Sequence, residues 1–420
     1  MNESIQLQPG IFLRCCTDKR FKTNSLSLQI VRPMCREEAA ANALISAVLL
    51  RGTQNHPDIR DITLHLDDLY GATVGSLVRR VGDYQTTGFY CSYTEDSYAL
   101  GGDEILKPTL AFLQELLLMP RLENGVFCES FVEGEKKNML SAIEAQKNDK
   151  RIYAASQLMK YMCAQDPTGI SRLGEPEDVR KLEPASLYRH YEKILRESRI
   201  DLFYVGSQDA QTIGRLVAPI FEKIERNYIP LPAQTPFCDG GDTRNEEQMD
   251  VTQAKLQMGF VTPSTIDTPD FVPYQVLNMV FGGGMTSKLF MNVREKMSLC
   301  YDIGSSYQGS KGILTVGAGM DVQKAQTVED EIMNQLECCK RGEISPQELE
   351  SAKEALLSSL RSIPDSPSSL ENYYATGALS GLRMTIPQYM EQVQQVTVEK
   401  LMEVAQKIRL HSVYLLKGVQ

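Results

Sequence analysis

The pattern of apolar and polar positions predicts short strands that alternate with longer helices between about Ile11 and Ile224. Residues 26–31 alternate with a period of two, as a half-buried strand does. An Ala- and Leu-rich stretch from Arg36 to Leu50 ends before Gly52 and predicts a helix. The same reasoning predicts strands over 88–93 and 201–206, and helices over 108–118, 129–147 and 209–223.

The second half of the chain repeats this order of elements. Residues 227–250 are rich in proline, glycine and charge and lack apolar periodicity, so they predict a linker, with a long loop inside one domain as the alternative. After them come strands over 254–260, 312–319 and 412–416, and helices over 271–279, 328–338 and 345–361. We therefore expect an α+β protein with two copies of one domain, 1–226 and 251–420. Each copy is a mainly antiparallel sheet with helices packed on one face.

Composition and charge remove several classes of partner. The chain has 420 residues, of which 42% are hydrophobic and 23% charged, as in ordinary globular proteins. Its net charge is 44 − 54 = −10, which argues against nucleic acid or an anionic membrane as a partner. No stretch is long and apolar enough to span a bilayer, and the first residues do not resemble a signal peptide. Ten cysteines, two adjacent pairs and six scattered residues without a CxxC motif, suit reduced thiols, so we expect a cytoplasmic protein.

Common catalytic motifs are missing. The four histidines do not form HExxH or HxxEH, so each is expected to be a surface or capping residue: His56, His65, His190 and His411. The glycines at 282–284 lack P-loop spacing, and Gly317-Ala318-Gly319 lacks the third glycine of a dinucleotide site. No G-x-S-x-G turn is present.

One segment is specific to a known family. It runs Phe281-Gly282-Gly283-Gly284-Met285-Thr286-Ser287-Lys288-Leu289-Phe290 and continues with Arg294-Glu295-Lys296, Leu299, Tyr301 and Ser305-Ser306-Tyr307. This segment resembles the C-terminal half of the pitrilysin/insulinase-type zinc peptidases, and the resemblance extends over the whole chain. In detail the chain looks most like the inactive YfmF-like branch of non-peptidase homologues. The resemblance implies a clam-like duplication of the LuxS/metallopeptidase type.

The resemblance also implies that the family's zinc site has been lost. Arg51-Gly52-Thr53 matches the segment that follows the family's H-x-x-E-H helix, which places Ala43, Ser46 and Ala47 at the two histidines and the glutamate. The downstream glutamate run matches 135–143, where Ser141 and Ala142 stand; a shift of register spares only Glu144. Methyl groups cannot ligate zinc, and a serine hydroxyl is a poor general base. We therefore expect no bound metal, no cofactor and no catalysis by this chain alone.

The other half of the family's active site is present in the sequence. In two-chain members of the family, an Arg and a Tyr of the C-terminal domain face the zinc of the partner, and Arg294 and Tyr301 match them. An Arg offers a cationic fork and a Tyr a hydroxyl group, both suited to binding a substrate and a developing oxyanion. The alternative is a solvated Arg and a packed Tyr. The sequence departs from the family at Ser298, where glycine is usual, and at Gly304, where larger residues are common.

These observations predict an inactive subunit of a heterodimeric zinc peptidase. Its partner is expected to be a zinc-bearing paralogue with H-x-x-E-H, with a homodimer when the chain is expressed alone, and its substrate a peptide or protein. A peptide-binding or scaffold protein without proteolysis is the alternative. A self-sufficient enzyme that uses other residues is a third hypothesis.

Overall fold

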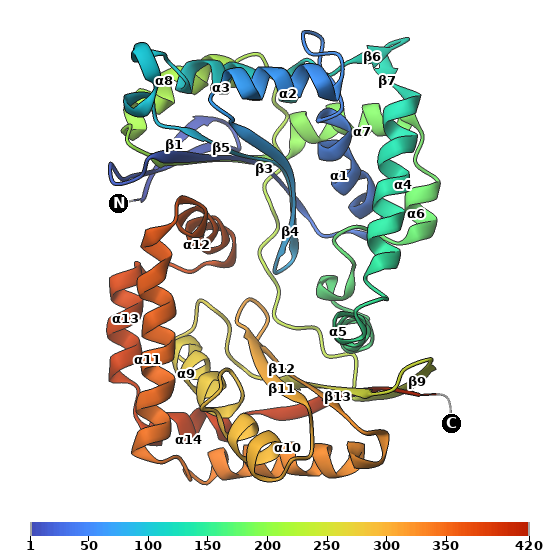
Figure 1. Ribbon diagram of the computed structural model, residues 1–420, viewed down its shortest axis with the longest axis vertical. Helices are drawn as coiled ribbons and strands as arrows, with labels where there is room; N and C mark the ends of the chain where they lie inside the picture. The colour runs from blue at the N-terminus through green and yellow to red at the C-terminus, as the bar shows by residue number, and fades with distance from the viewer. Residues whose placement is uncertain (1, 419–420) are drawn as a thin grey trace. The chain divides into compact units, whose positions relative to one another are not determined.

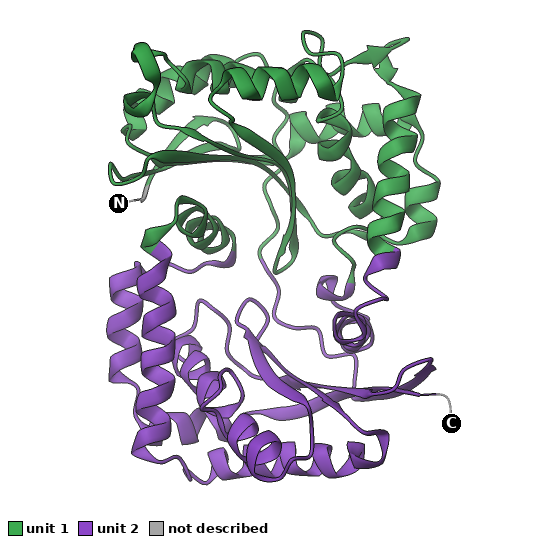
Figure 2. Cartoon of the chain, in the orientation of Figure 1, with its two compact units in different colours: residues 1–143, 170–233, 364–379 green, residues 144–169, 234–363, 380–420 purple. Residues whose placement is uncertain are grey.

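The chain folds into two units, each built on one mixed sheet (Figures 1 and 2). The computed structural model describes residues 2–418. Unit 1 consists of residues 1–143, 170–233 and 364–379, and unit 2 of residues 144–169, 234–363 and 380–420. Neither unit is one continuous segment, whereas the predicted domains 1–226 and 251–420 are.

The sheet of unit 1 has the strand order β1-β2-β8-β3-β5-β4. Its strands are β1 (Asn2–Gln8), β2 (Ile11–Thr17), β8 (Arg199–Gly206), β3 (Thr23–Pro33), β5 (Tyr84–Thr94) and β4 (Thr73–Val81). Only β2 and β8 pair in parallel. The predicted strands over 26–31, 88–93 and 201–206 are therefore confirmed as parts of β3, β5 and β8. A small hairpin is formed by β6 (Leu122–Glu123) and β7 (Val126–Phe127).

Helices cover one face of this sheet with the main hydrophobic core. The helices of unit 1 are α1 (Arg36–Leu49), α2 (Ile59–Asp68), α3 (Leu106–Leu118), α4 (Glu129–Ala145), α6 (Pro176–Arg180), α7 (Pro184–Glu197) and α8 (Ala210–Phe221). Alternate residues of β3, Leu26, Leu28 and Ile30, lie in one buried cluster with Leu44 of α1 and Leu113 of α3. The period of two in β3 thus directs its apolar side chains to a single core.

The sheet of unit 2 repeats the order of unit 1. It reads β11-β12-β10-β13-β9, with β9 (Thr243–Met249), β10 (Ala254–Val261), β11 (Asp302–Gln308), β12 (Ile313–Met320) and β13 (Arg409–Gly418). In both sheets the first strand lies parallel beside the last, followed by the second, fourth and third, with β1 as the addition in unit 1. The predicted duplication of an α+β domain is confirmed by this shared topology.

The first strand of the second copy, β9, lies inside the predicted linker. Its seven residues, TRNEEQM, alternate between half-buried and exposed positions along the edge of the sheet. Because nearly all of them are polar, this alternation is invisible in a hydrophobic pattern. The second copy therefore begins at Thr243, earlier than the predicted residue 251.

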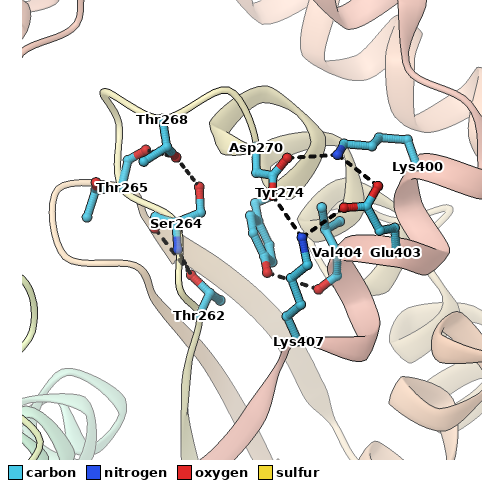
Figure 3. Close-up of polar contacts among 10 residues, drawn as sticks. All are labelled: Thr262, Ser264, Thr265, Thr268, Asp270, Tyr274, Lys400, Glu403, Val404 and Lys407. Atoms are coloured by element: carbon cyan, nitrogen blue, oxygen red, sulfur yellow. Dashed lines mark hydrogen bonds and ion pairs between the residues drawn. The ribbon is translucent and has the colours of Figure 1, made fainter.

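The helices of unit 2 are α9 (Phe271–Phe281), a π-helix (Leu289–Lys296), α10 (Ala325–Lys340), α11 (Pro346–Ser362), α13 (Ile386–Gln395) and α14 (Val398–Gln406). Figure 3 shows how α9 is fixed at its start. The Asp270 carboxylate accepts hydrogen bonds from Lys400, 2.8 Å away, and Lys407, 3.1 Å away, and the Tyr274 hydroxyl donates to the Val404 carbonyl at 2.9 Å. These contacts fasten α9 to α14 and so position the glycine-rich turn that follows α9.

Each unit also contains one helix from the other half of the sequence. Helix α5 (Lys150–Met162) belongs to unit 2, where Ala154 and Leu158 pack against Tyr414 and Leu416 of β13. Helix α12 (Pro367–Ser380) belongs to unit 1 through residue 379. The two helices occupy the same place in the order of elements of their copies, so the exchange is reciprocal.

Helix α12 is held on the sheet of unit 1 by a buried carboxylate. Glu371 is 1% exposed and accepts hydrogen bonds from Ser27 at 2.7 Å and Gln29 at 2.5 Å. Arg79 donates to both of its oxygens at 3.1–3.2 Å. A buried carboxylate needs such partners to remain charged. The contact therefore depends on all four side chains together.

Short 3-10 turns complete the described fold at Asp96–Tyr98, Leu100–Gly102, Pro167–Gly169, Val322–Lys324 and Ile363–Asp365. Between residues 2 and 418, no helix has both the length and the apolar character required to cross a membrane.

Candidate functional site

The helix expected to carry zinc ligands in related peptidases is α1. Its Ala43 and Ser46 are both 2% exposed, and Ala47 is half-buried. The Ser46 hydroxyl donates to the Ala43 carbonyl within the helix at 3.4 Å. These side chains serve packing and the helix backbone, and none is a zinc ligand.

The second predicted part of the lost site is on α4. Ser141 and Ala142 are both exposed on this helix. The segment after α1 contacts α4 through Arg51, whose guanidinium lies 3.4 Å from the Glu135 carboxylate. Among residues 2–418, no three or more His, Cys, Asp or Glu side chains are placed to hold a metal ion. The donor set at these positions does not fit zinc, so no step of a reaction is assigned to a metal on this chain.

Helix α1 instead takes part in a hydrogen-bond network of neutral polar side chains. The His190 Nε2 atom of α7 lies 2.7 Å from the Asn42 amide oxygen, and the Asn42 amide donates to Gln85 at 2.9 Å. Gln85 in turn donates to the Ala39 carbonyl at 2.9 Å. Asn42 and Gln85 are 2% and 1% exposed. Burial lowers the pKa of His190 from 6.5 to about 4, so the ring is neutral at pH 7.

The expectation that all four histidines are surface or capping residues is wrong for His411, which is 2% exposed. His56, His65 and His190 are half-buried. The His411 ring is within hydrogen-bond distance of Asp239, at 2.8 Å, and of Ser412, at 2.6 Å. A sequence without an alignment gives no signal of Asn42 as a partner of His190 or of Asp239 as a partner of His411, because each lies far away along the chain.

The glycine-rich turn after α9 is shaped by close packing. A Cβ atom at Gly282 would lie 2.7 Å from the Ser305 hydroxyl oxygen and 2.8 Å from Leu289, so only glycine fits there. The Ser305 amide donates to the Gly282 carbonyl at 2.9 Å, and its hydroxyl donates to the Asn278 side chain at 2.7 Å. The turn is thereby fixed against β11 and directs the chain into the π-helix.

The π-helix presents Arg294. Its buried residues Leu289 and Val293 anchor one side of the helix, and the Met297 amide donates to the Asn292 carbonyl five residues earlier at 3.0 Å. The extra residue per turn was not predicted from the sequence, and such turns are frequent at functional sites.

Three neighbours hold the Arg294 guanidinium in place. Its Nε atom donates to the Tyr301 carbonyl at 3.0 Å, and its Cζ atom lies 4.5 Å from the centre of the Phe290 ring. Its Nη1 atom lies 3.3 Å from Glu295. The Tyr301 backbone therefore helps to fix the position of the Arg294 side chain. The structure brings together the two residues that the sequence singled out.

Tyr301 follows a left-handed turn. Ser298 has φ +51°, a left-handed conformation that favours glycine, which agrees with the glycine that the family resemblance implies at this position. Ser298 adopts this conformation, so the departure leaves the turn formed. The Tyr301 side chain is 53% exposed, so it is a surface group rather than part of the packed core. Its hydroxyl donates to Asp321 at 2.8 Å.

Arg294 and Tyr301 line an open cavity of about 350 Å³ in unit 2. The other lining residues come from the same turn and from the end of β12: Glu295, Ser298, Leu299, Cys300, Asp321 and Lys324. The lining of the cavity therefore includes cationic donors, a phenol and two carboxylates. Sequence reasoning missed Asp321 and Lys324, because they lie about twenty residues after Tyr301 and carry no motif.

Comparisons with known proteins agree with this geometry. A family model described as "Peptidase M16 inactive domain" matches residues 181–356, which include the π-helix and the cavity. The relative described as "Probable inactive metalloprotease YmfF" from Bacillus subtilis is 29% identical over 422 residues, covering 100% of this chain and 99% of that protein. The chain is therefore similar, over its whole length, to members of the pitrilysin/insulinase-type (M16) peptidase family. A "Non-peptidase homolog YmxG" from Helicobacter pylori is 24% identical over 319 residues, covering 71% of each chain.

The structural comparison covers the whole chain. A crystal structure of a conserved protein from Enterococcus faecalis V583 is 26% identical and superimposes with a TM-score of 0.92, covering 100% of this chain and 99% of that one. The predicted family, its inactive branch and the α+β duplication are thus confirmed. The descriptions of the family model and of these relatives as inactive or non-peptidase support a non-catalytic pseudo-peptidase.

Proposed function

We propose that this pseudo-peptidase is the non-zinc subunit of a heterodimeric zinc peptidase. The partner is a paralogue that carries H-x-x-E-H and binds the metal. This chain supplies Arg294 and Tyr301 to the substrate. One observation carries the proposal: both side chains line an open cavity, while the helix equivalent to the zinc helix has only Ala and Ser at the ligand positions.

The chemistry at the cavity suits peptide hydrolysis in a partner's site. When water attacks a peptide carbonyl, negative charge develops on the carbonyl oxygen. A fixed cationic donor therefore contributes more in the transition state than in the ground state. Arg294 is such a donor. Its side chain is already held by the hydrogen bond from Nε to the Tyr301 carbonyl and by the Phe290 ring, so it loses little freedom when a substrate binds.

The proposal is tested by co-expressing the chain with the H-x-x-E-H homologue from the same organism. We expect a heterodimer by size exclusion and pull-down, about one zinc per heterodimer, and peptidase activity that neither chain has alone. Absence of a complex, or equal activity of the partner without this chain, would contradict the proposal.

A peptide-binding protein without proteolysis is the second candidate. It is favoured by the Tyr301 hydroxyl, which donates to Asp321 and is not free to donate to an oxyanion. A complex that binds peptides through Arg294 and Tyr301 but cleaves none, with zinc present on the partner, would support this candidate over the first.

A further inference from the structure

Strand β9 forms one edge of the sheet in unit 2. It pairs in parallel with β13 along its whole length without a shift of register, and within residues 2–418 no strand pairs with its other edge. The equivalent edge in unit 1, along β2, is covered by β1, which pairs with β2 antiparallel. The edge of β9 is therefore open where the first copy of the domain is closed (Figure 1).

The backbone of β9 is well suited to bind another strand. Proline residues, glycine residues and β-bulges commonly interrupt exposed edges, and β9 contains none of them. An uninterrupted edge presents a row of N–H and C=O groups that a further strand can pair with. Charged side chains of one sign would repel a second copy of the same strand, but β9 carries both signs: Arg244, Glu246 and Glu247.

These charges limit how two copies of β9 can pair. Arg244, Glu246 and Gln248 are exposed on one face, and the residues between them are half-buried on the other. Two antiparallel copies related by a twofold axis keep equivalent faces together, so opposite residues come from the same face. Three such registers oppose at least five residues of β9, centred on residues 245, 246 and 247. Those centred on Glu246 and Glu247 place a carboxylate opposite itself, which is destabilising.

The register centred on Asn245 brings opposite charges together. It places Arg244 of each copy opposite Glu246 of the other, so two ion pairs form across the twofold axis. The Arg244 side chain is 55% exposed and that of Glu246 is 49% exposed. Within the chain, Arg244 donates to Glu329 at 3.2 Å and Glu246 accepts from Lys417 at 2.5 Å. A guanidinium has five N–H donors and a carboxylate about four acceptor positions, so both groups can take a second partner.

We infer that the edge of β9 is a self-association surface, on which a second copy of this chain pairs its own β9 antiparallel about Asn245 to make one continuous sheet. One pair of strands buries less area than a stable complex does, so we expect a weak dimer with a Kd of roughly 10–100 µM. The contact uses none of the residues assigned to the proposed function and goes beyond it. Either can fail while the other holds.

The test is sedimentation equilibrium of the purified full chain over a range of concentrations. Arg244→Glu and Glu246→Arg should each raise the Kd more than about tenfold, because each replaces two ion pairs by two pairs of like charge. An equimolar mixture of these two variants should form a heterodimer as tightly as the wild type, because opposed residues again carry opposite charges. Gln248→Ala is the matched control, since Gln248 is exposed on the same face but opposes no residue of β9 in this register.

Cysteine cross-linking tests the register independently of the charges. In a Cys238→Ser background, which removes an exposed thiol, Asn245→Cys should form a disulfide-linked dimer under a mild oxidant. The two Cα atoms at this position would lie about 4.5–5.5 Å apart, within the range of a disulfide. Thr243→Cys in the same background should not cross-link, because its two copies would lie about 13 Å apart along the strands.

Several results would overturn the inference. They are a monomer at every concentration, an unchanged Kd in Arg244→Glu, no heterodimer in the mixture, and cross-linking at position 243 as strong as at position 245. Oligomers that grow beyond the dimer would also overturn it, because they indicate a contact between unlike edges, such as β9 of one copy on β1 of the next.

Discussion

Replacing His190 by glutamine should flatten the dependence of stability on pH. In the native state the neutral ring lies 2.7 Å from the Asn42 amide oxygen. Burial depresses its pKa, and the cations of Arg32 and Lys193 lower it further, while the Glu38 carboxylate acts in the opposite direction. Glutamine keeps an N–H donor for Asn42 but has no charge to gain.

The magnitude follows from the two pKa values. The folded value is about 4 and the ordinary value is 6.5. Above 6.5 both states are neutral and the stability is complete; as the pH falls from 6.5 towards 4, the unfolded chain takes up a proton that the folded chain does not. Each pH unit costs about 1.4 kcal/mol, so the wild type should lose about 2 kcal/mol through this group between about pH 7 and pH 5.

The assay is urea unfolding of both proteins at the two pH values. The wild type should lose about 2 kcal/mol more than His190→Gln on acidification. Glu192→Gln changes an exposed side chain on the same helix and should keep the slope of the wild type. If the free energy of unfolding depends on pH in the same way in the wild type and in His190→Gln, this account of the His190 hydrogen-bond network is refuted.

Three further predictions follow from the fold and the lost metal site. Glu371→Ala should lower the free energy of unfolding of unit 1 by about 2–3 kcal/mol. This is less than the usual cost of breaking a fully buried ion pair, because the Arg79 side chain is 31% exposed. An unchanged urea midpoint would contradict this prediction. Lys311→Met should cost about 3–5 kcal/mol, because it leaves the Asp166 carboxylate, 0% exposed like Lys311, without its cation; calorimetry showing an unchanged melting temperature would argue against it. The purified chain should contain far less than one zinc per chain by elemental analysis, and stoichiometric zinc would contradict its assignment as a pseudo-peptidase.

The sequence predicts those parts of the fold in which apolar residues have a regular period. Strand β3 and helix α11 are examples: alternate apolar residues of β3 reach one core, and α11 buries residues at helical spacing. The expectation that β3 is half-buried is wrong, because its polar residues Ser25, Ser27 and Gln29 are buried as well. Strand β9 could not be predicted, because polar side chains occupy its half-buried positions. The exchanged helices α5 and α12 also could not, because their partners are strands far away in the sequence.

The candidate site shows the same division. The spacing between Arg294 and Tyr301 is local, and the resemblance to a family identified both residues. The left-handed Ser298 agrees with the glycine expected there. Asp321 is brought to Tyr301 by the pairing of β11 with β12, and a contact of this kind depends on strand register that a single sequence does not reveal.

The measurement that tests the central claim most directly is the peptidase rate of the assembled complex with Arg294→Ala and Tyr301→Phe in this chain. The account predicts that Arg294→Ala lowers kcat by roughly 100- to 1,000-fold, the usual loss for one donor to an oxyanion, and that Tyr301→Phe lowers the rate as well, with assembly and the partner's zinc unchanged. Tyr98→Phe, which changes an exposed tyrosine of unit 1, should keep full activity. Full activity in the Arg294→Ala, Tyr301→Phe double variant would contradict the account and show that this segment is only structural.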